Sequence, residues 1–526
     1  MRAKAMKWII LLIFCPFLAQ AQPNNGTDRD SFPVQKPTAG TLAGIFYSVE
    51  EARVNILATE RLYLDFSDLE TLPVGITDLI YLKDIHLEGN EDMDWAQAFK
   101  LLAKLPRLQR LDLSYCGLRR LPDEIQLLKK LKNLNLSNNP DLDWEITFKK
   151  LAKLPKLSRL DLSTNNLENL DNNIGRLSQL KELYLWENQL TNLPPALGKL
   201  KKLEHLDISH NVLRRLPPEI GNLQSLKTLQ LWDNRLTELP ASVGRLKNLL
   251  MLDLSSNFVE ELPDELANLQ KLQKLEIPYN NLRYLPPNLG KMQQLEELDL
   301  SGNARMNWEM LFAESAPANL IEFNLSDNDL QRLPPALVEL DRLKTLNLSY
   351  NPRLRWGETF DILSRAANLE KLELNHNEII TLAAEIGQLP HLEELHLSQN
   401  EEMDWTKAFL CLSKLSKLSF LNISNNNLSE LPASVCDLSQ LRQLNLGKNP
   451  SLQLTKLFAV LKNSQSLQSL ILSNNDLSEI PAEISDMKKL KELHLWLNNF
   501  QHDSQMHAQL QEWLPNVDLI YMPMLD

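Results

Sequence analysis

The chain has 526 residues and a formal net charge of -13 at pH 7, with 55 Lys and Arg against 68 Asp and Glu. This length is more than one ordinary hydrophobic core supports. The acidic balance argues against nucleic acid or an anionic membrane as the partner, because an acidic surface repels both.

The first 21 residues have the three parts of a secretory signal peptide, in the usual order. A basic start over residues 1–7 precedes an apolar run over residues 8–18, and Ala19-Gln20-Ala21 then offers a small-x-small cleavage pattern. The apolar run is too short to span a bilayer comfortably, and the alternative is an uncleaved anchor or a buried helix. We therefore expect an exported protein that is periplasmic, at the cell surface or secreted, with a mature chain that begins near Gln22.

Two short regions precede the body of the chain. Residues 22–44 are rich in Pro, Gly, Asn, Thr and Asp, which is typical of a flexible leader. Residues 45–58 predict an N-terminal capping helix, because Ser48 and Glu51 have the spacing of a capping box.

The pattern L-x-x-L-x-L-x-x-N recurs nineteen times over residues 59–500, mostly at steps of 23 residues. One copy is formed by Leu203, Leu206, Ile208 and Asn211. A fixed period of this size predicts a solenoid, because each unit is too small to bury its own core and must pack on its neighbours. The repeats and their two caps leave no room for a second folded domain.

Each unit contains a segment in which apolar and polar residues alternate, as they do in a strand. In the unit that begins at residue 226, Leu229 and Leu231 are expected to point inward and Trp232 outward. The ninth position is Asn in all units but two, where Ser67 and Cys116 replace it. A buried amide there can satisfy backbone groups of the loop that leaves the strand, so we interpret the Asn ladder as structural.

The outer segments are of two kinds. Short units carry L-P-x-x-I/L-G-x-L, as in residues 216–223, where proline suits an extended segment. Six long units instead carry an apolar pair at i, i+4, the spacing of one helical face. The pairs are Trp95/Phe99, Trp144/Phe148, Trp308/Phe312, Trp356/Phe360, Trp405/Phe409 and Leu454/Phe458. Expected helix N-caps precede four of them, at Asp94, Asp143, Asn307 and Asp404. We interpret these tryptophans as core residues.

Residues 501–526 predict a C-terminal cap. Met506, Leu510 and Trp513 form a helical stripe, and residues 517–521 are expected to add a last half-strand. A cap is needed because an open solenoid end exposes its core.

The units resemble typical leucine-rich repeats, and the short outer segments resemble the Ras-suppressor-type class, which also occurs in many bacterial proteins. The resemblance implies an α/β leucine-rich repeat solenoid: a right-handed horseshoe with a parallel concave β-sheet and a mixed extended and helical convex side. It also implies binding of other proteins on the concave face. The signal peptide departs from the intracellular members of this class, so the chain looks more like an exported bacterial leucine-rich repeat protein.

No motif for catalysis or for a cofactor is present, so we expect no enzyme and no cofactor. His205, His210 and Asp207 fall in one unit, and weak metal binding there is the less favoured alternative to a chance grouping. Cys411 and Cys436 lie on the outer side of successive units; we favour two free thiols over a disulfide.

The concave face departs from its own consensus in one region. The seventh position of a unit is usually Ser, but it is Trp186, Trp232 and Trp496 in three units and Pro278 in another. Exposed tryptophans rimmed by polar groups are typical of a binding hot spot, although drift of the repeat explains them equally well. We call the residues of this predicted partner-binding site the central patch: Tyr184, Trp186, Glu187, His205, Asp207, His210, Gln230, Trp232, Asp233, Met251, Asp253, Glu276 and Tyr279.

The sequence thus favours an exported, non-catalytic scaffold that binds a protein or peptide on its concave face. The fifth position of the units holds many acids and no Lys or Arg, which would favour a partner with a basic segment. The alternative is a glycan or cell-wall polymer bound between the concave tryptophans. An enzyme with a hidden site is the least favoured hypothesis.

Overall fold

The computed structural model describes residues 44–312, 316–500 and 504–521. The predicted signal peptide and nearly all of the predicted leader lie outside the described residues. Among those described, no helix is both long and apolar enough to cross a lipid bilayer.

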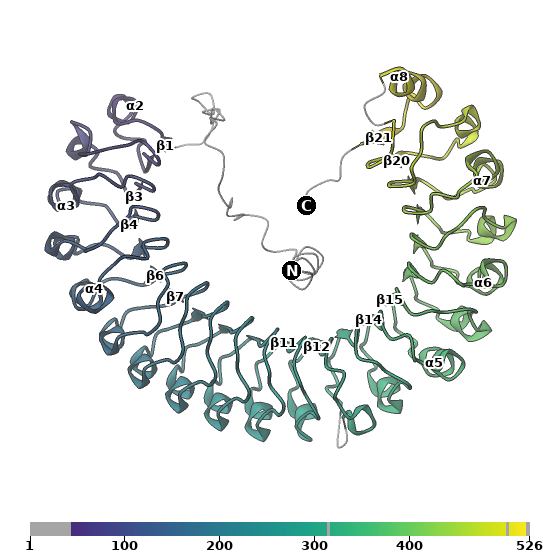
Figure 1. Cartoon of the computed structure of the whole chain (residues 1–526), viewed down its shortest axis with the longest axis horizontal. Coiled ribbons are helices and arrows are strands. Elements are labelled where there is room, and N and C mark those ends of the chain that lie inside the picture. The colour runs from purple at the N-terminus through teal and green to yellow at the C-terminus, as the bar shows by residue number, and fades with distance from the viewer. Residues whose placement is uncertain (1–43, 313–315, 501–503, 522–526) are drawn as a thin grey trace, which may run out of the picture.

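In the described residues, a single parallel sheet of 21 strands lines the inside of an open arch, and the helices lie on its outside (Figure 1). Consecutive strands pair in register; for example, Leu206 of one strand is the partner of Leu229 of the next. The strands are β1 (Ile45–Phe46), β2 (Arg61–Tyr63), β3 (Asp84–His86), β4 (Arg110–Asp112), β5 (Asn133–Asn135), β6 (Arg159–Asp161), β7 (Glu182–Tyr184), β8 (His205–Asp207), β9 (Thr228–Gln230), β10 (Met251–Asp253), β11 (Lys274–Glu276), β12 (Glu297–Asp299), β13 (Glu322–Asn324), β14 (Thr345–Asn347), β15 (Lys371–Glu373), β16 (Glu394–His396), β17 (Phe420–Asn422), β18 (Gln443–Asn445), β19 (Ser469–Ile471), β20 (Glu492–His494) and β21 (Asp518–Ile520). The predicted fold class is confirmed.

The convex side carries α-helices in five of the six long units. The α-helices of the described chain are α2 (Val49–Val54), α3 (Trp95–Leu102), α4 (Trp144–Leu151), α5 (Trp356–Leu363), α6 (Trp405–Leu412), α7 (Leu454–Leu461) and α8 (Ser504–Trp513). Three of the four predicted caps are confirmed, because Asp94, Asp143 and Asp404 each accept a hydrogen bond from the backbone N–H three residues later. Such a bond satisfies one of the donors left free in the first turn.

The short units end in 3-10 helices rather than in the extended segments that we predicted. Pro217 is extended, with φ -68° and ψ 146°, but the chain then turns into a 3-10 helix because Pro218 fixes φ at the first helical position. The 3-10 helices are η1 (Ile76–Asp78), η2 (Asp123–Leu127), η3 (Asn172–Arg176), η4 (Pro195–Lys199), η5 (Pro218–Asn222), η6 (Ala241–Arg245), η7 (Asp264–Asn268), η8 (Leu289–Lys291), η9 (Trp308–Met310), η10 (Pro335–Glu339), η11 (Ala384–Gln388), η12 (Ala433–Asp437) and η13 (Ala482–Asp486).

The helix predicted after Asn307 is wrong. Asn307 makes no side-chain capping bond, and among the described residues of this unit the short η9 follows it in place of an α-helix. The unit from residue 295 to 319 has 25 residues, whereas the five other long units have 26. With one residue fewer the chain lacks the length for the same helix, and Phe312 takes a left-handed φ of 57° while remaining buried.

The Asn ladder is confirmed as a structural device. The Nδ2 of Asn211 donates to the carbonyl of Leu185 in the preceding unit at 2.9 Å and to its own unit's Ile208 at 3.1 Å. Its Oδ1 accepts the backbone N–H of Leu190 at 2.9 Å. Each ladder Asn therefore ties two units together through buried backbone groups. Each carbonyl is shared with the Asn of a neighbouring unit: Leu185 also accepts Nδ2 of Asn188 at 3.0 Å, and Ile208 accepts Nδ2 of Asn234 at 2.9 Å. Cys116 is buried at the same position, with its Sγ 3.3 Å from the carbonyl of Leu87, and burial raises its pKa to about 12.

Candidate functional site

The central patch lies over five consecutive strands, β7 to β11. The register places Tyr184, Asp207, Gln230, Asp253 and Glu276 side by side across these strands. The patch residues at the eighth position of their units have left-handed backbone, as Tyr279 does with a φ of 54°. The structure therefore brings the predicted residues together on one surface.

The tryptophans of the patch are less exposed than we predicted. Trp186 and Trp232 are both only partly exposed. The imidazole of His210 packs edge-on against the indole of Trp232, with ring centroids 3.8 Å apart, and its Nδ1 lies 2.7 Å from Oδ2 of Asp233. His210 belongs to the unit between the two tryptophans, so its ring occupies part of the slot between them.

Tyr184 is held in place by charged neighbours. The guanidinium of Arg159 lies 4.4 Å from the centre of its ring and donates to its hydroxyl at 3.1 Å. The hydroxyl in turn donates to the carboxylate of Glu182 at 3.1 Å. A cation over an aromatic face stabilises this arrangement, so Tyr184 presents an ordered surface.

The acids at the fifth position cap the turn that leaves each strand. Oδ1 of Asp207 accepts the backbone N–H of Ser209 at 3.0 Å, and Asp253 accepts both the N–H and the hydroxyl of Ser255. Burial raises the pKa of both carboxyls. These two acids therefore have a structural role, and only part of each carboxylate remains available to a partner.

Glu276 is the most perturbed acid of the patch. Its carboxylate lies 3.1 Å from Nζ of Lys274, which also reaches Glu297 at 3.1 Å. Burial, together with the charge of Asp253, nevertheless raises the pKa of Glu276 to about 7. Because the charged form is disfavoured, a cation from a partner would be accommodated here at low cost.

We expect Glu276→Gln to stabilise the fold at pH 8 and to leave it unchanged below pH 4.5. The folded pKa of about 7 lies above the ordinary value of 4.5, so this side chain's contribution to stability is complete below 4.5 and is lost as the pH rises through 7. Removing the charge should recover about 1 kcal/mol, measured by urea unfolding at both pH values. Glu297→Gln, which faces the same lysine, is the control and should show no such gain.

Exposed aromatic side chains occur at the eighth position of four separate units, and among them only Tyr279 was predicted as a site residue. Phe66, Tyr115, Tyr279 and Tyr350 are exposed there, and all four have positive φ. The ring of Tyr279 lies over Gly302, where a Cβ would come within 2.5 Å of it. Residues other than Asn, Asp and Gly are uncommon in this conformation. Aromatic residues at the eighth position of a unit were therefore the feature of the sequence that could have indicated this surface.

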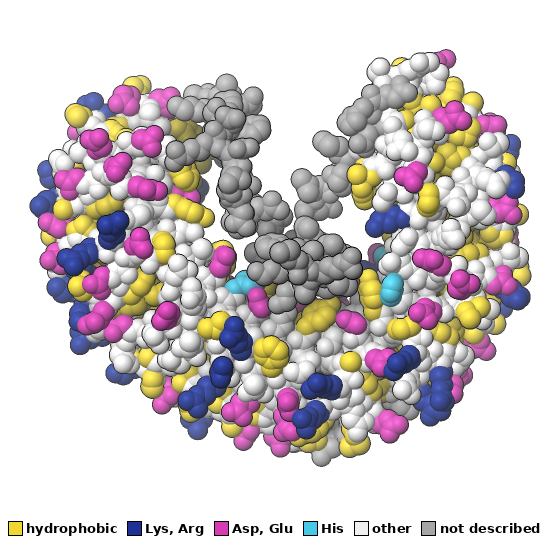
Figure 2. Space-filling model, viewed as in Figure 1, with side chains coloured by type: hydrophobic (Ala, Val, Ile, Leu, Met, Phe, Trp, Pro, Cys, Tyr) yellow, Lys and Arg dark blue, Asp and Glu magenta, His cyan; other side chains and the backbone are white. Residues whose placement is uncertain are grey.

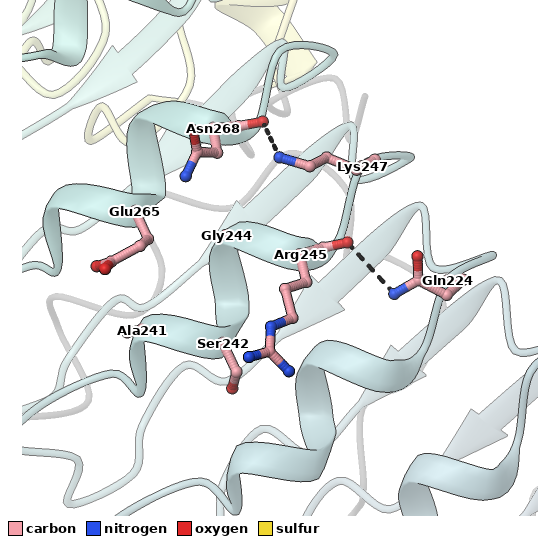
Figure 3. Close-up of a pocket in the computed structure, with 8 residues that line it drawn as sticks. All are labelled: Gln224, Ala241, Ser242, Gly244, Arg245, Lys247, Glu265 and Asn268. Carbon is pink, nitrogen blue, oxygen red and sulfur yellow. Dashed lines mark hydrogen bonds between the residues drawn. The ribbon is translucent and has the colours of Figure 1, made fainter.

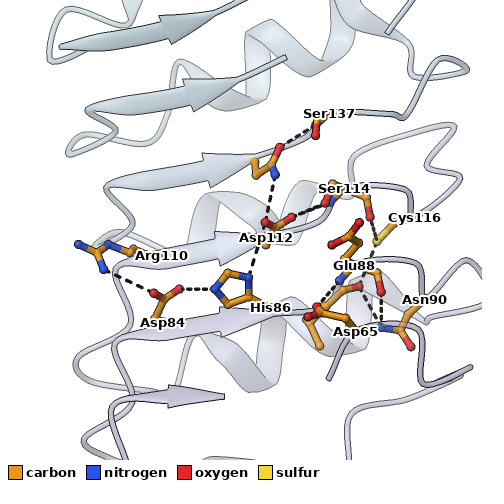
Figure 4. A network of polar contacts seen from close by, with 12 residues as sticks. Asp65, Asp84, His86, Glu88, Asn90, Arg110, Asp112, Ser114, Cys116 and Ser137 are labelled. Atoms are coloured by element: carbon orange, nitrogen blue, oxygen red, sulfur yellow. Dashed lines mark hydrogen bonds and ion pairs between the residues drawn. The ribbon is translucent and has the colours of Figure 1, made fainter. Parts of the chain in front are cut away.

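A polar network at the N-terminal end was also missed (Figure 4). His86 lies between Asp84 and Asp112, at 3.4 and 3.7 Å, and its ring stacks on Tyr63 with centroids 4.2 Å apart. Burial and the charge of nearby Asp112 raise the pKa of Glu88 to about 7. The sequence indicated this network at the seventh position of the first two units, where Asp65 and Glu88 replace the usual Ser.

Two cavities of the described chain lie away from these surfaces. A cavity of about 500 Å³ opens beside η6, on the outer side of the arch (Figure 3). Gln224 and Lys247 at its wall donate hydrogen bonds to backbone carbonyls of neighbouring units. These lining groups belong to the repeated turns, so we assign the cavity no function.

The two histidines of the metal alternative contact other side chains of the concave face. Nδ1 of His205 lies 2.7 Å from the hydroxyl of Thr228, and His210 contacts Trp232 and Asp233. No three His, Cys, Asp or Glu side chains of the described residues are grouped as metal ligands would be. Cys411 and Cys436 are free thiols, as we favoured.

Comparison with known proteins identifies the repeats. A family profile described as "Leucine-rich repeat region" matches residues 134–233 and 196–310, and one described as "Leucine Rich Repeat" matches residues 107–128, 417–438 and 466–487. The chain is a leucine-rich repeat protein. No curated protein matches its sequence.

Solved structures of other leucine-rich repeat proteins have the same fold. One from Leptospira interrogans is 28% identical, with a TM-score of 0.55 over 81% of this chain and 98% of its own. The protein chain of a TLR13–ssRNA13 complex is 23% identical, with a TM-score of 0.62 over 88% of this chain and 68% of its own.

Proposed function

We propose that this leucine-rich repeat protein is an exported, non-catalytic scaffold that binds a protein or peptide on its concave face. The observation that carries the proposal is the alignment of the central patch across β7 to β11. Partly exposed aromatic rings beside carboxylates offer large apolar area together with selectivity. The proposed export depends on the basic, apolar and cleavage regions of residues 1–21.

A partner with a basic segment fits the charge of the patch. Glu187 and Asp233 are exposed at its margin, and Glu276 is perturbed in the way that a neighbouring cation would relieve. Asp207 and Asp253 contribute less than we expected from the sequence, because their Oδ1 atoms are already bonded to the backbone.

The glycan alternative has less support than the protein partner. A sugar ring held between Trp186 and Trp232 needs the space between the two indoles. That space is partly filled by His210, which packs on Trp232 with ring centroids 3.8 Å apart.

The proposal is tested by crosslinking and mass spectrometry of the secreted and envelope fractions, followed by affinity measurement with the captured partner. Trp186→Ala combined with Trp232→Ala should weaken binding about 30-fold, the effect of losing about 2 kcal/mol at a hot spot. Trp496→Ala is the matched control, because it changes the same repeat position outside the patch. Equal affinity of the double variant and the control, at an unchanged melting temperature, would contradict the proposal. Capture of polysaccharide in place of protein would support the glycan alternative.

A further inference from the structure

One edge of the arch carries a positive charge that the net charge of the chain conceals. Residues 101–202 hold 18 Lys and Arg against 11 Asp and Glu, whereas the whole chain holds 55 against 68. In the face drawn in Figure 2, acidic and basic side chains are interspersed around the arch. The excess of cations in residues 101–202 is concentrated where the outer helices return to the sheet.

We call this surface the basic edge. It consists of the five segments that lead from α3, η2, α4, η3 and η4 into strands β4 to β8: residues 103–109, 127–132, 152–158, 176–181 and 199–204. These segments contain twelve Lys and Arg, all exposed, and a single carboxylate, that of Glu204. The cations are therefore gathered in adjacent units, in positions that repeat from one unit to the next.

The one carboxylate does not neutralise the edge. Glu204 is at its end, and there it pairs with Lys181 at 2.8 Å and with Lys227 of the next unit at 2.6 Å. No other cation of the basic edge, which is described in full, has a carboxylate within 4.0 Å. Lys129 and Lys130 instead reach backbone carbonyls of the neighbouring units, at 3.4 and 2.6 Å. Like charges held this close together without counter-charges favour the binding of a polyanion.

The shape of the edge favours a flexible linear polymer. The strands repeat about every 4.8 Å, so a chain that runs along the edge meets cations unit after unit. The edge follows the curve of the arch from β4 to β8 (Figure 1), which a stiff nucleic acid duplex does not follow without bending.

The chemistry of the edge disfavours the two other common polyanions. Single-stranded nucleic acid needs free aromatic faces for its bases, but the nearby ring of Tyr81 is covered by the guanidinium of Arg107 at 4.5 Å. Binding within a lipid surface needs several apolar side chains, and Leu127 is the single large one exposed in the basic edge.

We infer that the basic edge is a second binding surface, separate from the concave face, and that it binds an acidic polysaccharide. The ligand is defined by its chemistry: a flexible sugar polymer that carries sulfate or carboxylate groups along its length. This surface is independent of the proposed function and does not require the central patch.

The test uses the full-length protein with labelled heparin and polygalacturonate, by fluorescence anisotropy at increasing NaCl. The variant is Lys129→Glu, Lys130→Glu and Lys132→Glu combined. The control is Lys488→Glu, Lys489→Glu and Lys491→Glu combined, which makes the same charge change at the same turn of a distant unit, beside Asp486. We expect at least tenfold weaker binding of the variant, less than twofold for the control, and a loss of binding with salt.

Three outcomes would overturn the inference. These are no saturable binding of either polysaccharide by the wild type, equal weakening by variant and control, or tighter binding of duplex DNA or phosphatidylglycerol vesicles than of both polysaccharides. The melting temperatures of both variants are measured in parallel, since exposed lysines should be replaceable without unfolding. Trp186→Ala with Trp232→Ala should leave polysaccharide binding unchanged, and this separates the basic edge from the concave face.

Discussion

Phe409→Ala is expected to lower the free energy of unfolding by about 3–5 kcal/mol. Phe409 is fully buried on the inner side of α6, where it lies beside Trp405 with ring centroids 6.1 Å apart. Truncating it removes buried apolar surface and leaves a cavity that the flanking η11 and η12 cannot close, because each is fixed to its own strand.

The loss should be local, because units of a solenoid contact only their neighbours. Hydrogen exchange is expected to accelerate in the units from residue 369 to 440 and to stay unchanged near the N-terminus, while urea unfolding reports the size of the loss. Leu410→Ala is the control: Leu410 is the next residue of the same helix and is 57% exposed, so its truncation should cost less than about 0.5 kcal/mol. Similar losses for both variants would show that the Phe409 side chain does not carry the packing.

The sequence was sufficient for the core because one pattern is repeated many times. A leucine that recurs at the same position of every unit is compatible only with the apolar core of the solenoid. Leu229 occupies such a position and is fully buried, as predicted. The same reasoning identified the outer tryptophans as core residues, and this is confirmed for Trp95 and Trp405, which are 7% and 9% exposed. Trp144, Trp308 and Trp356 pack against the core but are only partly buried. It failed at Asn307, where the residue types match a helix start but the unit is one residue short.

The binding surfaces were harder to predict because they depend on side-chain direction and on local charge. The contact of His210 with Trp232 arises from a left-handed residue after β8, whose side-chain direction no periodicity predicts. The capping role of Asp253 requires a folded turn. The basic edge was missed because the net charge averages over the whole arch, whereas a ligand experiences the charges within about 10 Å.

Asn351→Leu is also expected to have a large effect, and should lower the free energy of unfolding by about 3 kcal/mol or more. Nδ2 of Asn351 donates to the carbonyls of Leu325 and Leu348 at 3.0 Å each. Its Oδ1 accepts the backbone N–H of Leu330 at 3.0 Å. Oδ1 also accepts the backbone N–H of Asn328 at 3.2 Å. Leucine has a similar volume but no polar atoms, so the change leaves these two N–H groups buried without the acceptor they had, at about 1–3 kcal/mol for each. The two carbonyls each lose one bond and keep another, from Nδ2 of Asn328 and of Asn377.

Asn351→Cys should recover part of this loss, because the chain itself places a cysteine in the ladder. Sγ of Cys116 lies 3.3 Å from the carbonyls of Leu87 and Ser114, which are equivalent to two of the acceptors of a ladder Asn. A thiol is a weak donor and offers little to the backbone N–H that Oδ1 accepts, so recovery should be incomplete. The midpoint of urea unfolding is therefore expected to be highest for the wild type, lower for Asn351→Cys and lowest for Asn351→Leu. A leucine variant as stable as the wild type would mean that water reaches these backbone groups and that the ladder does not hold the units together.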